Sequence, residues 1–199
     1  MGKIFYVMGK SASGKDTIYK ELRKQCPSLG TVTLYTTRPM REGEANGEEY
    51  FFVSPKELEA WRAAGKVIEE RTYQTIHGPW TYFTVEDGQI CLKERDYLMI
   101  GVLDSYRKMR DYFGEKVVLP LYIEVEDGIR LERAIQREKR QKQPRYRELC
   151  RRFLADEEDF SEENLKKYGI EKRYVNGELE RCIEEIRGDY RELAAVHEK

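Results

Sequence analysis

Two hydrophobic patterns alternate along this chain. Continuous apolar runs at residues 3–8, 97–104 and 117–125 are typical of strands that are buried on both faces of a parallel sheet. Apolar residues recur at helical spacing in residues 17–25 and 179–193. The alternation predicts an α/β fold in which helices flank a parallel-sheet core.

A first excursion leaves this core at about residues 33–90. Short runs of β-branched and aromatic residues predict strands at residues 31–37, 49–54, 67–73 and 82–85. Between them, Ser54 as an N-cap, Pro55 at the first helical position and Gly65 near the end predict a helix.

A second excursion, at about residues 126–165, is basic in its first part and acidic in its last. Such a composition predicts charged helices that lie outside the core. A strand expected at residues 170–177 returns the chain to the sheet. We therefore expect one domain, whose core comprises about residues 1–32, 91–125 and 166–199.

The composition narrows the cellular setting. A chain of 199 residues holds one core, and its net charge of −1 creates no global field for nucleic acid or an anionic membrane. No apolar stretch resembles a signal peptide or approaches the roughly 20 residues of a membrane span. The four cysteines are scattered and only two histidines are present, so a structural zinc site is not expected. We expect a cytoplasmic protein with no nucleic-acid or membrane partner, and its oligomeric state stays open.

The stretch VMGKSASGKDT, residues 7–17, contains the frame G-x-x-x-x-G-K between a predicted strand and a predicted helix. In that context the glycines let successive backbone N–H groups face one anion, and the helix N-terminus adds a favourable potential. Lys15 would reach the β- and γ-phosphates of a nucleotide. The candidate ATP phosphate-binding residues are Gly9, Ser11, Ser13, Gly14, Lys15, Asp16 and Thr17.

Asp16 stands where such a loop usually carries Ser or Thr. Its carboxylate is a suitable oxygen ligand for Mg²⁺, and it would equally favour the dipole of the helix N-terminus, so both roles stay open. Thr17 supplies a hydroxyl next to it, and Asp104 ends an apolar run, where a second acidic metal ligand is expected. The candidate metal ligands are therefore Asp16, Thr17 and Asp104.

A second anion site is indicated by Arg38 and Arg41, which flank a proline after a predicted strand. Two converging guanidinium groups suit a phosphate monoester, because each can donate two parallel hydrogen bonds. Tyr50 can add a hydroxyl donor.

The stretch TTRPMREGEANGEEYFFVS, residues 36–54, resembles the guanylate kinase signature T-T-R-x-x-R-x-G-E-x-x-G-x-x-Y-x-F-V-S. The resemblance implies a P-loop NTPase-type core, a nucleoside-monophosphate-binding region at 33–90 and an arginine-bearing lid at 126–165. It implies that the acceptor nucleotide GMP is held by Arg38, Arg41, Tyr50 and Glu69. Glu69 would accept hydrogen bonds from the N1 and N2 hydrogens of guanine.

The resemblance also assigns lid and donor-site residues. Besides Lys15 and Arg38, the implied catalytic residues lie in the lid and are Arg133, Arg137 and Arg151, with Arg140 as a competing alternative. Arg151 and Glu158 keep the spacing of the second lid arginine and its glutamate in the family. Asn176 resembles the asparagine that lies near the adenine of the donor.

Several positions depart from the family pattern. Leu34 stands where a serine contacts the base, and residues 77–79 read His-Gly-Pro in place of Y-G-[ST]. Two aspartates of the family fall on or near Ile100 and Val102. These changes fall mostly in base recognition and not in phosphate handling.

The sequence thus predicts a kinase that uses ATP and Mg²⁺ to phosphorylate a nucleoside monophosphate, with GMP to GDP as the favoured reaction. A first alternative is a related small-molecule kinase such as a ribose 1,5-bisphosphate kinase, because the Gly-Lys-Asp loop resembles the loop of those enzymes. A second is a non-catalytic guanylate-kinase-like binding module, although such modules tend to lose the phosphate loop that this chain retains.

Overall fold

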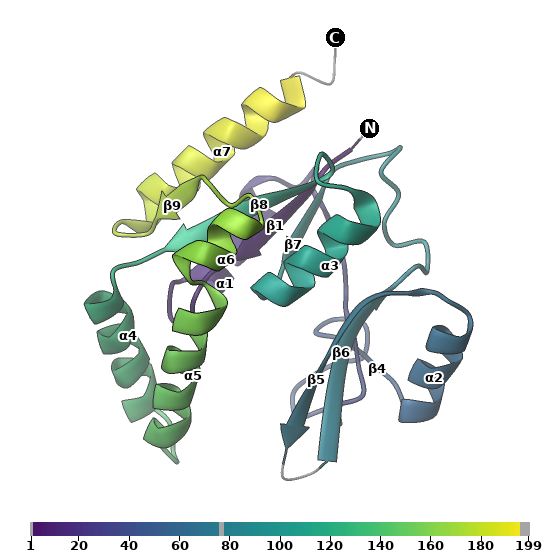
Figure 1. Cartoon of the computed structure of the whole chain (residues 1–199), viewed down its shortest axis with the longest axis horizontal. Helices are drawn as coiled ribbons and strands as arrows, with labels where there is room; N and C mark the ends of the chain where they lie inside the picture. The colour runs from purple at the N-terminus through teal and green to yellow at the C-terminus, as the bar shows by residue number, and fades with distance from the viewer. Residues whose placement is uncertain (1, 76–77, 196–199) are drawn as a thin grey trace.

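The computed structural model describes residues 2–75 and 78–195 of the chain. Five parallel strands form the core sheet in the order β2-β7-β1-β8-β9 (Figure 1). Their bounds are β1 Ile4–Met8, β2 Gly30–Thr31, β7 Tyr97–Ile100, β8 Val118–Glu124 and β9 Arg173–Val175. All residues of the central strand β1 are buried, as the continuous apolar run predicted.

Helices cover both faces of this sheet, so the core has three layers. On one face, Phe5 and Val7 of β1 pack against apolar side chains of α1 (Lys15–Gln25) and α7 (Leu179–Ala195). On the other face, Ile4 and Tyr6 pack in the cluster that contains α3 (Leu103–Phe113) and α6 (Glu162–Lys167). The predicted α/β fold with a helix-flanked parallel sheet is confirmed.

A second, smaller sheet has the strand order β4-β3-β6-β5. Its strands are β3 Tyr35–Thr36, β4 Phe51–Phe52, β5 Val67–Thr75 and β6 Gly78–Val85. Helix α2 (Pro55–Ala63) packs on it through Leu58, which lies against Phe83 and Val85. The predicted start of α2 is confirmed, since the Ser54 side chain accepts from the N–H of Glu57 and the Glu57 carboxylate accepts from the N–H of Ser54.

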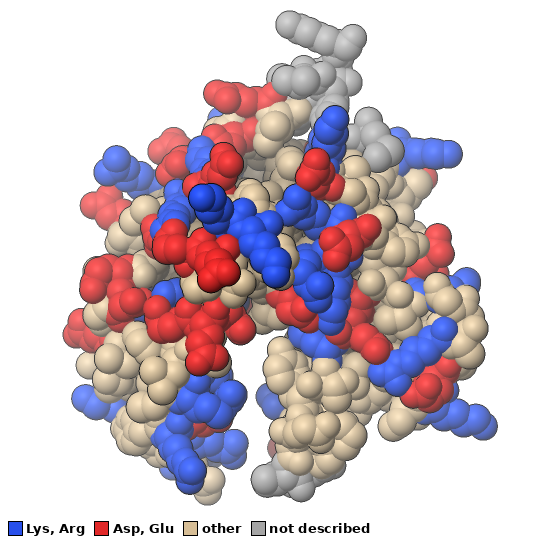
Figure 2. Space-filling view, viewed as in Figure 1, with Lys and Arg blue, Asp and Glu red and all other residues tan. Residues whose placement is uncertain are grey.

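The charged stretch after β8 forms α4 (Asp127–Lys139) and α5 (Tyr146–Asp159), which lie side by side and project from the core (Figure 1). Figure 2 shows a notch between this helical lobe and the lobe made by β5 and β6. We refer to residues 127–159 as the lid. The notch leads toward the end of β1, where the glycine-rich loop begins.

Two predicted strands differ from the observed ones. Residues 31–37 do not form one strand, because β2 pairs with β7 in the core sheet and β3 pairs with β6 in the second sheet. The apolar run at 97–104 is a strand only as far as Ile100, and Leu103 begins α3. Asp104 therefore lies in the first turn of a helix and not at the end of a strand.

Gly101 directly follows β7 and lies close against Tyr6. A Cβ atom at this position would overlap the hydroxyl of Tyr6, which comes from the neighbouring strand β1. The buried Tyr6 side chain thus leaves no room for a Cβ atom at position 101.

We expect Gly101→Ala to lower the free energy of unfolding by about 2 kcal/mol, because the new methyl group overpacks a full site. The substitution Tyr6→Phe removes the overlapping oxygen, so the double variant should lose less stability than the sum of the two single variants. Urea denaturation of the unmodified protein, the two single variants and the double variant measures these free energies of unfolding. Gly188→Ala is the control, since its Cβ would meet nothing within 4 Å on helix α7, and it should be neutral or stabilising. Additive losses of stability from Gly101→Ala and Tyr6→Phe would contradict a steric overlap between the new methyl group and the Tyr6 hydroxyl.

Candidate functional site

The glycine-rich loop joins β1 to α1 and exposes the N-terminus of that helix. Gly14 is the N-cap residue and adopts a φ of 87°, so no side chain caps the first turn of α1. Ala12 also has a positive φ, of 63°, and the N–H of Ser13 donates to the carbonyl of Lys10 at 3.2 Å. Gly9 lies so close to β8 that a Cβ would come within 2.5 Å of the Ile123 carbonyl. The loop therefore turns tightly, and the uncapped N–H groups of the helix remain for an anion.

Asn176 braces this loop from the end of β9. Its amide Nδ2 donates to the Ser13 carbonyl at 2.8 Å, and the residue is only 4% exposed. A side chain at Gly14 would overlap the same amide, which explains the second glycine of the motif. Arg133, one of the predicted lid arginines, donates to the Asn176 carbonyl at 3.2 Å. Asn176 and Arg133 thus lie directly beside the loop.

Lys15 and Asp16 begin helix α1 together. The Lys15 ammonium lies 3.5 Å from a carboxylate oxygen of Asp16, whose side chain is 75% exposed. An exposed carboxylate in the first turn interacts favourably with the helix dipole, and its free oxygen remains accessible to a cation. Thr17 follows on the exposed surface of the same turn.

The lid contacts the loop through a buried arginine that the sequence patterns did not single out. Arg130 of α4 is 1% exposed, and its Nη1 donates to the Ser11 carbonyl at 3.3 Å. Three carboxylates surround its guanidinium, and the Phe153 ring lies 4.0 Å from its Cζ atom. The carboxylates belong to Asp127, Asp156 and Glu157. We call these four charged residues the Arg130 cluster.

The Arg130 cluster also binds the loop backbone directly. A carboxylate oxygen of Asp156 accepts from the N–H of Ser11 at 2.7 Å, and the Lys10 ammonium lies 2.7 Å from Glu157. The Asp156 carboxylate of the lid therefore already accepts a hydrogen bond from one of the backbone N–H groups that the phosphate-loop motif presents. Lid position and loop conformation are coupled by these contacts.

Arg38 is the centre of the second predicted anion site. It is 4% exposed, and its guanidinium donates to both carboxylate oxygens of Glu44, at 3.0 and 2.8 Å. These hydrogen bonds hold the pKa of Glu44 below its usual range. The Cζ atom of Arg38 lies 5.6 Å from the centre of the Tyr50 ring and 5.3 Å from that of Phe52.

Arg41 contributes to the same loop through its backbone. Its N–H donates to Glu44 at 2.8 Å, while its side chain extends into solvent. Glu44 therefore orders Arg38 and the backbone of Arg41 together. The predicted trio of Arg38, Arg41 and Tyr50 is brought into one region, and Glu44 is the additional residue that organises it.

Glu69, the predicted base-contacting residue, is paired and covered. Its residue exposure is 2%, and it accepts from the Thr84 hydroxyl at 2.9 Å. Arg71 places its Nη1 3.3 Å from each of the two Glu69 oxygens, and the same nitrogen contacts the Ser105 hydroxyl. Arg71 is a second site residue that sequence reasoning missed.

A cavity of about 530 Å³ lies between the second sheet and the core. Leu34, Tyr50, Arg71 and Ile100 all line it, together with residues from α1 and from the loop before β4. We call it the acceptor cavity, because Tyr50 connects it to Arg38. The two apolar departures from the family pattern, Leu34 and Ile100, thus face the same space.

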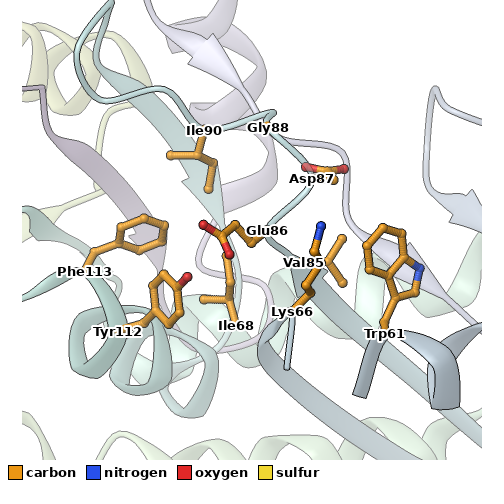
Figure 3. Close-up of a pocket in the computed structure, with 10 residues that line it drawn as sticks. All are labelled: Trp61, Lys66, Ile68, Val85, Glu86, Asp87, Gly88, Ile90, Tyr112 and Phe113. Atoms are coloured by element: carbon orange, nitrogen blue, oxygen red, sulfur yellow. The ribbon is translucent and has the colours of Figure 1, made fainter. Parts of the chain in front are cut away.

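A different hollow of about 540 Å³ lies on the far side of β5 and β6 (Figure 3). Trp61 and Lys66 stand on one side of it, and Tyr112 and Phe113 of α3 stand on the other. None of the predicted site residues lines it. It marks the junction between the second sheet and the core.

Other predicted residues lie apart from these sites. Asp104 is ion-paired with Arg107 and Lys108 on α3, at 2.9 and 2.7 Å. Arg151 is ion-paired with Glu148 on the exposed surface of α5. The lid residues Arg137, Arg140 and Glu158 are also exposed. His77 lies outside the described residues.

No group of three or more His, Cys, Asp or Glu side chains within residues 2–75 and 78–195 is placed to hold a metal ion. In the same part of the chain, no helix combines the length and the apolar character needed to cross a bilayer.

Comparison with known proteins identifies the family of this chain. The guanylate kinase family model matches residues 1–91. A guanylate kinase of Thermosynechococcus vestitus is 30% identical over 134 residues, which are 65% of this chain and 69% of that relative. The chain belongs to the guanylate kinase family.

Further relatives within the guanylate kinase family match in a more limited way. The guanylate kinase of Gloeobacter violaceus is 38% identical over 73 residues, or 37% of this chain and 36% of that relative. The matched part of the chain therefore spans little more than a third of that curated relative. The crystal structure of guanylate kinase from Anaplasma phagocytophilum covers 96% of this chain and 85% of its own, with a TM-score of 0.62 and 20% identity. This likeness shows that the guanylate kinase fold, with its P-loop NTPase-type core, extends beyond the matched N-terminal part.

Arg130 and Arg71, which the sequence patterns did not single out, differ in how far the local sequence indicates their positions. Arg130, Ala134 and Glu138 recur every four residues and form the buried stripe of α4, so helical spacing could have indicated that Arg130 faces inward. Arg71 and Glu69 are two residues apart on β5, which places both side chains on one face of the strand. Nothing in the local pattern indicates that they pair.

We expect Arg130→Met to lower the free energy of unfolding by about 3 kcal/mol, because it leaves three carboxylates facing one another without their cation. Arg152→Met on the same lid is the matched control. Arg152 is exposed and its distance to Glu148 is 3.4 Å, so its loss should be below about 1 kcal/mol. Urea denaturation compares the two variants. Equal and small losses would contradict a structural role of the Arg130 cluster.

Proposed function

We propose that this protein is a nucleoside monophosphate kinase that transfers the terminal phosphoryl group of ATP to GMP, forming GDP. One observation carries the proposal. A complete phosphate loop and a buried, carboxylate-held Arg38 beside Tyr50 occur in one chain of the guanylate kinase family. Two anion sites in one protein suit a reaction that joins two phosphorylated substrates.

In the proposed reaction the donor phosphates occupy the loop from Gly9 to Thr17, where Lys15 supplies the positive charge. Arg38, Arg41 and Tyr50 hold the phosphate of the acceptor. Arg38 would meet that phosphate already oriented by Glu44, so little ordering is left to occur on binding. No covalent intermediate is required, because positioning and electrostatic stabilisation account for phosphoryl transfer.

The lid arginines would complete the site when the notch closes over the nucleotides. Arg133 already lies beside the loop through its contact with Asn176, whereas Arg137 and Arg151 project from the lid surface. Asn176 would lie at the donor side, close to the adenine nucleotide. Closure of this kind excludes water, which would otherwise compete as a phosphoryl acceptor.

Two of the three predicted metal ligands, Asp16 and Thr17, suit Mg²⁺. The exposed Asp16 carboxylate beside Lys15 offers a hard oxygen ligand, and Thr17 offers a hydroxyl in the same turn. Asp104 fits less well, because Arg107 and Lys108 already neutralise it. When bound with ATP, the ion supplies positive charge to the phosphates. We propose Asp16 and Thr17 as the residues that hold it.

The reaction is tested by measuring ADP formation with GMP, dGMP, AMP, UMP and ribose 1,5-bisphosphate as acceptors. We expect turnover with GMP and dGMP and much less with UMP, since the acceptor cavity of about 530 Å³ accommodates a purine. Turnover with ribose 1,5-bisphosphate alone would replace the proposal by a sugar-phosphate kinase. A protein that turned over none of the five would be a binding module.

We expect Lys15→Ala to lower kcat with GMP by about 10³-fold or more, because a charge that faces the transferred phosphoryl group is lost. Its free energy of unfolding should change by less than about 0.5 kcal/mol, since the residue adds little to the core. Lys20→Ala, at an exposed position of the same helix, should leave both quantities unchanged. Normal turnover in Lys15→Ala would contradict the phosphate-loop mechanism.

A further inference from the structure

The guanidinium of Arg71 lines the acceptor cavity together with polar, charged and apolar residues. The Arg71 side chain is 15% exposed and lines the cavity between Leu34 and Ile100. Tyr50 lines the same cavity, and its ring lies 5.4 Å from that of Tyr82. An acceptor whose phosphate is held near Tyr50 therefore extends its other end toward Arg71.

Arg71 is held in place from behind. Its Nη1 contacts both oxygens of Glu69 and the hydroxyl of Ser105, and its Cζ lies 5.7 Å from the centre of the Tyr82 ring. The hydrogen bonds of Arg71 to described residues all use Nη1, so within that part of the chain Nη2 and Nε are left to donate to a ligand in the cavity that Arg71 lines. Burial is the largest influence on Arg71 and opposes its charge, but Glu69 together with Tyr6, Tyr73 and Tyr50 outweighs burial, so the pKa of Arg71 is raised.

Glu69 is poorly placed to bind a base directly. Its side chain is 1% exposed, its two oxygens face Arg71, and Thr84 donates to one of them. A base that approached with its own N–H donors would have to displace the guanidinium first. At this position the cavity thus presents the guanidinium of Arg71 and not the Glu69 carboxylate.

We propose that Arg71 determines the base specificity of this protein by donating to the O6 and N7 atoms of a 6-oxopurine, so that GMP and IMP are both acceptors. The proposal rests on the kinase function proposed above. O6 and N7 are adjacent acceptors that match the fork of a guanidinium, whereas adenine presents an amino donor in place of O6. The exocyclic N2 amine, which only guanine carries, is not required for this contact. Glu69 acts as a positioning residue for Arg71.

A second phosphate group is a poorer fit for this wall. Glu69 already neutralises Arg71. The carboxylates of Glu48 and Glu49 also line the cavity, and they offset the charge of Arg23, the other lining arginine. Leu34 and Ile100 offer apolar contact to a flat base and no hydrogen bond to a dianion. The surroundings of Arg71 therefore favour a neutral base with acceptor atoms.

The direct test compares kcat/KM of the unmodified protein for GMP, IMP and AMP. We expect IMP to lie within about fivefold of GMP and AMP to lie about 100-fold below both, in line with the discrimination of a bidentate arginine contact. If GMP exceeds IMP by 100-fold, the N2 amine is read and the proposal is overturned while the kinase function stands. If only ribose 1,5-bisphosphate is phosphorylated, the kinase proposal fails as well.

Variants separate Arg71 from Glu69. Arg71→Lys keeps a cation beside Glu69 and protects folding, but it cannot donate two parallel bonds. We expect kcat/KM for GMP and IMP to fall together by about 10- to 100-fold, with AMP changed by less than about threefold. Arg62→Lys, on the exposed helix α2, is the matched control and should change none of the three.

The variant Glu69→Gln shows whether Arg71 or Glu69 recognises the base. With Arg71 as the reader, the variant keeps the ratio of GMP to IMP near its original value, even if both rates fall. A selective loss of GMP turnover in Glu69→Gln would assign recognition to the N1 and N2 hydrogens and would overturn the proposal. An Arg71→Lys variant with unchanged GMP and IMP kinetics would overturn it too.

Discussion

The buried guanidinium of Arg130 links the phosphate loop to the lid. A desolvated charge of this kind is tolerated only among close partners, and Asp127, Asp156 and Glu157 supply them from two helices of the lid. The same cluster reaches the loop through Ser11, whose carbonyl accepts from Arg130 and whose N–H donates to Asp156. The phosphate loop and helices α4 and α5 are therefore joined into one structural unit. Donor phosphates that approach the loop would compete with an acidic side chain of the lid, so binding and lid position are expected to depend on one another.

The acceptor side repeats this arrangement. Arg38 is held by Glu44 and Arg71 by Glu69, so these two arginines near the proposed substrate are oriented by a carboxylate before a ligand arrives. Such pairing lowers the cost of burying a guanidinium and fixes the direction of its remaining N–H groups. It also places a compensating carboxylate beside each of these two guanidinium groups. Recognition here relies on oriented donors more than on an excess of positive charge.

The features that depend on neighbouring residues could be predicted from the sequence. The glycine loop, the capping of α2 by Ser54 and the grouping of Arg38 with Tyr50 are encoded within short stretches. The features that were missed depend on distant contacts. Arg130 meets Ser11 across 119 positions of the chain, and Arg71 meets Ser105 across 34, so neighbouring residues do not indicate these partners. The need for glycine at position 101 likewise depends on the Tyr6 side chain of another strand, which local apolar content does not indicate.

The central claim is that a phosphoryl group passes between two bound nucleotides and not to water. Phosphorus-31 NMR of the protein with ATP, Mg²⁺ and GMP follows every phosphorus atom during the reaction. The account predicts that the signals of ADP and GDP grow at equal rates, with inorganic phosphate absent at early times. Growth of inorganic phosphate in place of GDP would show hydrolysis, and it would contradict the assignment of Arg38, Arg41 and Tyr50 to an acceptor phosphate.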